Sequence, residues 1–206
     1  MGSERLPGKT LMSMGQGSLL QLLLRRVKRA RSLSSLVVAT TEDVRDDPIA
    51  HLAACEGIES FRGSESDVLG RFAAVCEAEG ADVIVRLTGD NPWLDPCLID
   101  CLVARFLGAT RPLDYLSNTL DRSFPRGFDV EVISRSALER AHLEAHRSDE
   151  REHVTLHLYR HPERFAIESY GMRFTVDTAE DLKAMQLLAE AVAEEAMEKI
   201  VANKKS

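Results

Sequence analysis

Short runs of aliphatic and β-branched residues alternate along the first half of the chain with longer segments whose apolar residues recur every three or four positions. The short runs are typical of buried strands and the longer segments of amphipathic helices. In chain order they predict a helix after Ser18, a strand at Leu36–Thr40, a helix from Pro48 to Cys55, a strand at Ile58–Phe61, a helix ending at Glu79 and a strand at Val83–Leu87. Alternation at such short spacing predicts a parallel sheet with right-handed crossovers.

The pattern changes in the second half of the chain. It predicts a helix from Pro96 to about Leu107, strands at Tyr115–Thr119 and Phe128–Ile133, a helix from Ser134 or Ser136 to about His146, a helix capped by Asp149, strands at Arg164–Glu168 and Met172–Val176, and a long helix behind a Thr178–Asp181 capping box. Strict alternation in Phe128–Ile133 places Asp129 and Glu131 on one face of their strand. Two such carboxylates either face solvent or line a pocket for sugar hydroxyls.

Composition and charge narrow the class of protein. The 206 residues are 44% hydrophobic and 29% charged, with no apolar run near 18 residues, which predicts one soluble, cytoplasmic domain without membrane insertion. The net charge of −7 argues against nucleic acid as a partner, because backbone phosphates require a basic surface.

Cysteine and histidine spacing gives little support for a zinc or redox site. No C-x-x-C pair occurs among the cysteines, which are expected to be reduced thiols: Cys55, Cys76, Cys97 and Cys101. His153 and His157 are four residues apart, a spacing that can bind zinc with a third ligand. The absence of an H-E-x-x-H motif disfavours such a site.

Asp90 is the strongest candidate for chemistry. It lies in the turn that ends the Val83–Leu87 strand, and ligands of open α/β sheets bind at the carboxyl ends of strands. A carboxylate there can hold a hard cation against a phosphate, or it can simply accept hydrogen bonds from the turn. Asp177 repeats this pattern after the Met172–Val176 run, and the two acids together would supply the protein ligands of a divalent cation if they converge.

The first ten residues form a basic loop that contains glycine and proline. Gly2 and Gly8 let the backbone approach a ligand closely, and Arg5 and Lys9 supply donors of the kind that hold phosphate oxygens. The alternative is a disordered terminus with a few chance cations.

Five motifs then appear in order along nearly the whole chain. They are R-L-P-G-K at Arg5–Lys9, V-R-L-T-G-D-N-P at Val85–Pro92, F-P-R-G-F-D-V-E-V at Phe124–Val132, R-E-H-V-T at Arg151–Thr155 and V-D-T-A-E-D-L at Val176–Leu182. Together they resemble the sugar cytidylyltransferases, most closely the spore-coat polysaccharide SpsF-type branch, which is related to the acylneuraminate and 3-deoxy-manno-octulosonate cytidylyltransferases. Each motif alone is modest, and their shared order makes the resemblance specific.

The resemblance implies a GT-A-like, Rossmann-related fold with a mixed, mainly parallel sheet flanked by helices. It also implies Mg²⁺-dependent transfer of CMP from CTP to a small sugar, with release of pyrophosphate, for surface polysaccharide or glycoconjugate synthesis. Residues 1–110 would be the nucleotide-binding half of a single domain, 111–180 the sugar-binding half, and 178–202 a C-terminal helix.

Site residues follow from the same resemblance. Nucleotide binding would fall to Gly2, Ser3, Arg5, Lys9, Gly63, Ser64 and Asp67. Mg²⁺ would be held by Asp90 and Asp177, with Lys9, Arg5 and Asp90 as the catalytic set. The acceptor sugar would face Arg126, Asp129, Glu131, Arg151, Glu152 and His153.

One departure from the family pattern stands out. Family members carry a hydrophobic first strand and a further arginine ahead of the Gly-Ser of the basic loop, whereas Met1 directly precedes Gly2 here. The first strand, which would lie centrally in the sheet, is therefore expected to be lacking. The uncovered apolar surface favours self-association, for instance as a homodimer.

Two other functions stay open at this point. One is a GT-A glycosyltransferase that uses a nucleotide-sugar, although the cationic loop fits triphosphate chemistry better and no D-x-D motif is present. The other is an inactive, truncated binding domain. The identity of the sugar is not encoded in any recognisable motif.

Overall fold

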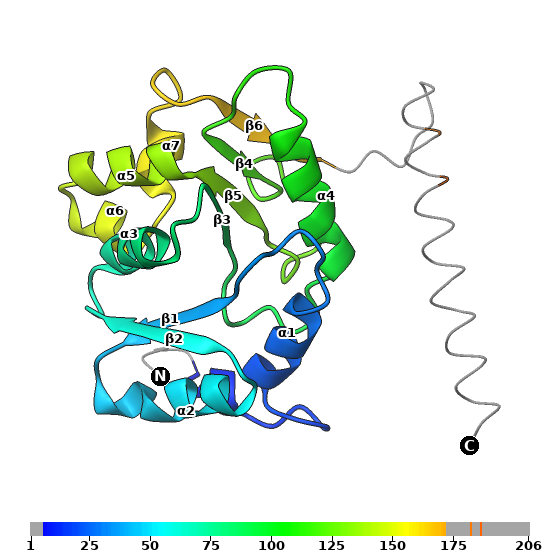
Figure 1. Cartoon of the computed structure of the whole chain (residues 1–206), viewed down its shortest axis with the longest axis vertical. Coiled ribbons are helices and arrows are strands. Elements are labelled where there is room, and N and C mark those ends of the chain that lie inside the picture. The colour runs from blue at the N-terminus through cyan, green and yellow to red at the C-terminus, as the bar shows by residue number, and fades with distance from the viewer. Residues whose placement is uncertain (1–5, 172–181, 183–185, 187–206) are drawn as a thin grey trace. The chain divides into compact units, whose positions relative to one another are not determined.

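The computed structural model describes residues 6–171 together with Leu182 and Gln186. The chain divides into two units, Met1–Tyr170 and Gly171–Ser206, and the fold described here is that of the first (Figure 1). Its elements are η1 (Lys9–Leu11), α1 (Leu19–Val27), β1 (Val37–Thr41), η2 (Val44–Asp46), α2 (Asp47–Cys55), β2 (Glu59–Gly63), α3 (Val68–Glu79), β3 (Val83–Arg86), α4 (Pro96–Leu107), β4 (Tyr115–Ser117), β5 (Glu131–Ser134), α5 (Arg135–Glu144), α6 (Ser148–Glu152), α7 (Leu156–Arg160) and β6 (Ile167–Ser169).

The helices of the first half begin and end where local chemistry predicts. The Ser18 hydroxyl caps α1 by accepting a hydrogen bond from the Gln21 amide at 3.2 Å. The buried side of α1 carries the predicted apolar stripe, Leu20, Leu23, Leu24 and Val27. Gly80 ends α3 in the left-handed conformation with φ of 63°, which costs glycine little because it has no Cβ.

The strands form two sheets, and the parallel pairing predicted for the first half is confirmed for β1 and β2 but does not extend to β3. β1 and β2 pair in parallel, whereas the other sheet has the order β3-β5-β4-β6. In that sheet β5 is antiparallel to both β3 and β4, and β4 is parallel to β6. The mixed sheet flanked by helices that the family resemblance implied is confirmed.

A reversal between β4 and β5 explains the antiparallel pairing. The chain turns at Gly127, which has φ of 101°. The Asn118 side chain then joins the two arms of the connection: its amide nitrogen donates to the Phe128 carbonyl at 2.7 Å and its oxygen accepts from the Val130 amide at 2.9 Å. The returning strand β5 is thereby placed between β3 and β4.

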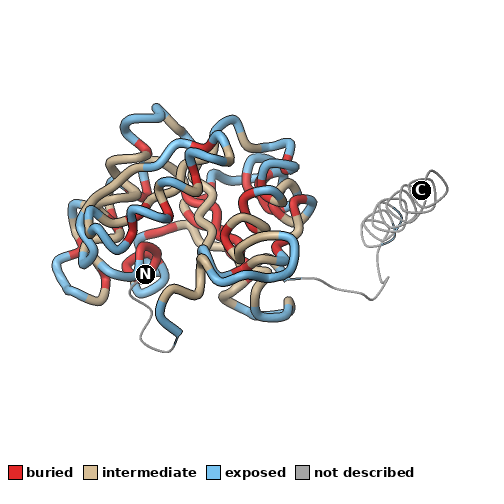
Figure 2. The backbone as a smooth tube through the Cα atoms, turned by 90° about the horizontal axis from the view of Figure 1, so that it is seen from below, coloured by how far each residue is buried: buried red, intermediate tan, exposed pale blue. Residues whose placement is uncertain are grey.

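Both faces of the four-stranded sheet are covered. Leu116 and Val132 are paired neighbours that pack into the apolar cluster containing residues of α1 and α4. Tyr115 and Ile133, the next pair along, pack into a second cluster containing residues of α3 and α5. Alternate side chains therefore enter two different cores, as expected of a strand buried on both faces. Figure 2 shows this buried interior enclosed by exposed loops and helix surfaces.

An apolar cavity of about 620 Å³ separates β1 from β3. Its lining comes from both strands, Val37–Thr40 and Val83–Arg86, and from the helices α1 and α3. Within the described residues neither of the facing strands pairs across this space. The edges of β1 and β3 and the helix side chains around them therefore line an apolar space between the two sheets, and the lack of a first strand stays a prediction.

Other expectations meet different outcomes. The helix predicted behind Asp149 is two short helices, α6 and α7, that meet at His153–Thr155. His153 is therefore exposed at the end of α6 while His157 is buried within α7, and the two do not share one helix face. The Met172–Val176 strand and most of the 178–202 helix lie outside the described residues. No helix among the described residues is long and apolar enough to cross a membrane.

Candidate functional site

Lys9 and Asp90 form an ion pair beyond the carboxyl end of β3, although they are 81 positions apart in the sequence. Lys9 Nζ donates to Asp90 Oδ2 at 2.6 Å. Lys9 follows Gly8, whose φ of 69° turns the basic loop back onto the protein. The approach is close, since a Cβ added to Gly89 would lie 3.7 Å from Thr10 Cγ2. The fold thus brings together two of the three predicted catalytic residues.

The Asp90 carboxylate is charged and accessible. Its side chain is 44% exposed and that of Lys9 is 30% exposed. Partial burial raises the pKa of Asp90, but hydrogen bonds from Lys9 and Thr88 more than offset this, so the pKa lies below its ordinary value. A solvent-accessible carboxylate of this kind can hold a hard cation.

Two buried polar atoms next to this pair have no hydrogen-bond partner within the described part of the chain. They are Thr10 Oγ1 and Asn91 Nδ2. Because buried polar atoms are normally paired, such atoms indicate a place where a ligand completes the hydrogen bonding. The residues around Asp90 therefore fit a bound polar group as well as a cation.

The other predicted nucleotide-site residues lie at the end of β2 and the start of α3. Gly63 has no room for a side chain, because a Cβ there would lie 2.8 Å from Arg71 Cγ. Ser64 is exposed, with its hydroxyl 3.2 Å from that of Ser66. Asp67 caps α3 by accepting from the Gly70 amide at 2.9 Å. Nucleotide binding by these residues stays a prediction.

A second, polar cavity of about 510 Å³ adjoins the Lys9–Asp90 pair through Thr88, which lies two positions before Asp90. Its lining residues are Arg86, Thr88, Thr119, Leu120, Arg122, Asp129, Glu131, His153, Thr155 and Tyr159. We call this space the acid-lined cavity. Asp129 and Glu131 both reach it, which confirms that they share one face, and His153 joins them.

Glu131 is the most constrained side chain of the acid-lined cavity. It is buried, pairs with Arg86 from the neighbouring strand, and accepts hydrogen bonds from the Tyr115 hydroxyl at 2.6 Å and the Thr155 hydroxyl at 2.7 Å. Burial, followed by the charge of Glu131, raises the pKa of Tyr115 far above its ordinary value, so Tyr115 stays a hydrogen-bond donor. These contacts hold the carboxylate rigidly in the wall.

Asp129 is paired in a similar way nearer the surface. Arg122 Nη1 donates to Asp129 Oδ1 at 2.6 Å and Nη2 to Oδ2 at 3.2 Å. Because each carboxylate of the cavity has an arginine partner, the wall presents charged donors beside charged acceptors. Such a lining suits a ligand with many hydroxyl groups, which donates and accepts at once.

Three of the six predicted acceptor residues are not among those that line the cavity. Arg151 instead connects α6 to α3, donating to Asp67 Oδ2 at 2.5 Å and to the His142 carbonyl at 2.7 Å. Arg126 and Glu152 are exposed. Their contact with a substrate stays a prediction.

Sequence reasoning missed several residues of the cavity. Arg86 lies inside the V-R-L-T-G-D-N-P motif and Thr155 inside the R-E-H-V-T motif, so the sequence carries a signal for both. Arg122 and Tyr159 carry no comparable signal, because their places in the wall depend on the turn before β5 and on the break between α6 and α7. Gly2, Ser3, Arg5 and Asp177 lie outside the described residues.

Comparisons with known proteins identify the family of the chain. A family model described as cytidylyltransferase matches residues 1–204. The spore coat polysaccharide biosynthesis protein SpsF of Bacillus subtilis is 35% identical over 210 residues, covering 94% of this chain and 85% of that protein. A solved cytidylyltransferase of Leptospira borgpetersenii has a TM-score of 0.80 and 34% identity over 90% of this chain and 81% of that one.

A more distant structure shares the fold alone. It is CMP:2-keto-3-deoxy-manno-octonic acid synthetase complexed with CTP, with a TM-score of 0.62 and 17% identity over 94% of this chain and 95% of that one. The match of the family model to almost the whole chain, together with the SpsF relationship, decides the family. The chain belongs to the cytidylyltransferases and is a nucleotidyltransferase enzyme.

Proposed function

We propose that this enzyme transfers CMP from CTP to a hydroxyl group of a sugar, in a Mg²⁺-dependent reaction that supplies surface polysaccharide or glycoconjugate synthesis. The observation that carries the proposal is the position of the Lys9–Asp90 pair beside the acid-lined cavity. Lys9 can pair with a triphosphate, and Asp90 can hold the divalent cation that accompanies it. Both lie next to the acid-lined cavity, whose lining suits a sugar with several hydroxyl groups. The polysaccharide context comes from the SpsF relationship.

The reaction forms a bond between the sugar oxygen and the α-phosphorus and breaks the bond from that phosphorus to the bridging oxygen of the leaving pyrophosphate. The hydroxyl proton passes from the sugar to solvent, and pyrophosphate leaves. The transition state requires alignment of the two oxygens and compensation of charge on the phosphate groups. Lys9 supplies positive charge at one end of this arrangement, and the fixed arginine–carboxylate pairs of the cavity orient the sugar at the other.

The metal ligands follow from the same geometry. Mg²⁺ would be held by Asp90, and by Asp177 outside the described residues; when bound it would offset charge on the phosphate oxygens. Lys9 neutralises Asp90 through their ion pair. A bound triphosphate would offer Lys9 a phosphate partner, and the Asp90 carboxylate would then be available to hold the cation.

Asp90→Asn provides the direct test. Pyrophosphate release would be measured with CTP, Mg²⁺ and a panel of sugars, and the variant is expected to lose about 10²–10³ in rate, as for removal of one preorganised electrostatic group. Asp82→Asn is the matched control, because Asp82 lies just before the other end of β3 with a 97% exposed side chain. Its rate should equal that of the unmodified enzyme.

Several outcomes would contradict the proposal. Equal rates for the Asp90 and Asp82 variants would show that Asp90 has no role in the reaction. Full activity after a chelator has taken up the divalent cations would show that the reaction does not require Mg²⁺. Turnover of a nucleotide-sugar donor, with no pyrophosphate from CTP and any sugar, would indicate a glycosyltransferase instead.

A further inference from the structure

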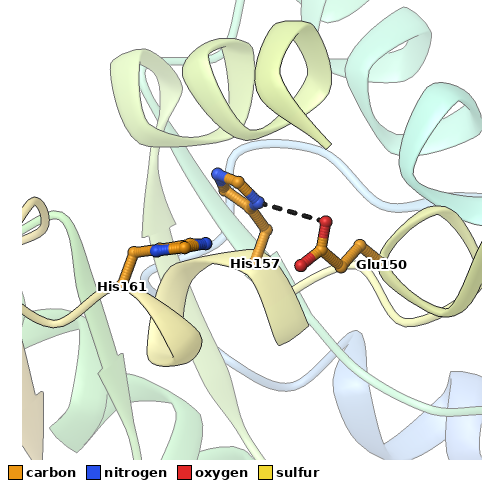
Figure 3. A group of neighbouring side chains, drawn as sticks. All are labelled: Glu150, His157 and His161. Atoms are coloured by element: carbon orange, nitrogen blue, oxygen red, sulfur yellow. Dashed lines mark hydrogen bonds and ion pairs between the residues drawn. The ribbon is translucent and has the colours of Figure 1, made fainter. Parts of the chain in front are cut away.

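Three side chains that play no part in the proposed reaction converge between α6 and α7. They are Glu150 from α6, His157 from α7 and His161 just beyond it (Figure 3). One carboxylate oxygen and one ring nitrogen of each histidine all lie within 4.8 Å of one another. Glu150 and His157 are buried, and His161 is partly exposed.

We propose that this cluster is a binding site for a zinc-like divalent cation. Two imidazoles and one carboxylate are ligands of Zn²⁺, Co²⁺ or Ni²⁺, whereas Mg²⁺ and Ca²⁺ prefer oxygen ligands alone. Three protein ligands leave one tetrahedral position for water, and the exposed side of His161 provides access to it. The cluster is thus separate in chemistry from the hard-cation site proposed at Asp90.

The surroundings of His157 set its ring for metal binding. Its Nε2 lies 3.3 Å from Glu144 Oε2, and its Nδ1 lies 3.4 Å from Glu150 Oε2. We assign the ring proton to Nε2, donated to Glu144, which turns the Nδ1 lone pair toward Glu150. A carboxylate behind a histidine ligand in this manner is the usual support of a protein-bound metal, because it fixes the tautomer and raises the basicity of the ring.

The three ligand atoms have to move only slightly closer together to bind a zinc ion. Ligand atoms about 2.0–2.1 Å from a tetrahedral zinc ion lie about 3.3 Å from one another. The separation of 3.4 Å between Glu150 Oε2 and His157 Nδ1 is already close to this value. His161 has to move inward; its side chain is 37% exposed, its Nδ1 lies 3.5 Å from a Glu163 carboxylate oxygen, and its ring already lies against that of His157, with the ring centroids 4.6 Å apart.

Arg160 is the competing charge. Its Nη1 lies 3.4 Å from Glu150 Oε1, and its Nη2 donates to Asp149 Oδ2 at 2.8 Å. The arginine therefore uses the oxygen of Glu150 that does not face His157, and its stronger contact is with Asp149. Oε2 is left for the metal, so binding does not require the loss of the Arg160 ion pairs.

A cation bound to Glu150, His157 and His161 would stabilise the part of the chain that forms one wall of the acid-lined cavity. Thr155 and Tyr159 line that cavity from the same corner of chain that carries His157. Linking α6 to α7 through one ion would fix this corner, as structural zinc sites do in short helical segments with little core of their own. The role is structural and does not depend on the reaction proposed above.

The test uses the full-length protein freed of metal by a chelator and then dialysed. Zn²⁺ and Co²⁺ would be titrated separately, with bound metal measured by elemental analysis, Co²⁺ coordination by visible absorption and stability by thermal melting. We expect one equivalent of Zn²⁺, a higher melting temperature in zinc and Co²⁺ bands typical of nitrogen and oxygen ligands. Glu150→Gln and His161→Ala should each weaken binding at least about tenfold.

His146→Ala is the matched control, because His146 is an exposed histidine close to α6 in the sequence, and it should bind like the unmodified protein. Should His161→Ala fail to fold, the Glu150→Gln titration and the Co²⁺ spectrum still decide the question. The proposal is overturned if the protein takes up no stoichiometric Zn²⁺, or if Glu150→Gln binds normally. It is also overturned if His51→Ala abolishes binding, since His51 and Cys55 lie 3.7 Å apart and offer another pair of donors.

Discussion

The Arg86–Glu131 pair provides the sharpest test of how the acid-lined cavity is held together. Glu131 is only 7% exposed and has two neutral hydrogen-bond donors besides Arg86. Arg86→Met removes the cation and leaves a buried carboxylate that the two hydroxyls compensate in part. Breaking a buried pair in this way costs about 3 kcal/mol, at the lower end of the usual range. For a chain of this length the melting temperature should fall by about 6–12 °C.

A double-mutant cycle separates the pair from its surroundings. Glu131→Gln keeps both hydroxyl contacts and should cost about 1.5–3 kcal/mol, because it weakens hydrogen bonds to a charged group and strands Arg86. The double variant should be more stable than the sum of the single changes implies, with a coupling of about 2 kcal/mol. Urea unfolding followed by circular dichroism measures each free energy.

The Arg105–Glu168 pair supplies the control cycle. Its atoms are 2.6 Å apart, but its side chains are 48% and 30% exposed, so water screens the attraction. The coupling measured with Arg105→Met and Glu168→Gln should be below about 1 kcal/mol. Equal couplings in the two cycles would refute the argument that burial makes the Arg86–Glu131 pair a rigid part of the cavity wall.

Two further predictions concern the residues that position the site. Arg151→Met should destabilise the protein by about 1 kcal/mol at neutral pH, because Asp67 loses its partner between α3 and α6. Burial raises the pKa of Asp67, but the hydrogen bonds from Arg151 and the Gly70 amide lower it by more, so the folded-state pKa lies below the ordinary value. The stabilisation from this pair is therefore present above the unfolded-state pKa of about 4. It is lost as the pH falls through the lower folded-state pKa. Chemical unfolding at a series of pH values should therefore show the difference between variant and unmodified protein shrinking toward acid, and a constant difference would contradict this reading. Gly8→Ala forces a side chain into the left-handed region at φ of 69°, which should lower the free energy of unfolding by about 1 kcal/mol. The strain should also displace Lys9, so the KM for CTP should rise. An unchanged KM would show that the loop conformation does not position Lys9.

The sequence by itself determined most of the described helices and strands and the chemistry of their ends. The Ser18 cap, the apolar stripe of α1 and the Gly80 stop of α3 act over a few residues, so they could be recognised without knowledge of the fold. The alternation around Asp129 and Glu131 likewise placed both acids on one face, because the two-residue period of an extended chain is a local property. The motifs and their order identified the family.

The tertiary structure decided which of these pieces meet. The insertion of β5 between β3 and β4 depends on the reversal at Gly127 and on the two apolar cores that β5 separates, and neither is a local property. That insertion creates the Arg86–Glu131 pair across neighbouring strands. The contact of Lys9 with Asp90 and the convergence of Glu150 with His157 and His161 likewise depend on how separate elements pack together. Pairings between distant residues follow from the packing of whole elements, because many combinations of partners satisfy the same local pattern and only one of them buries both faces of the sheet.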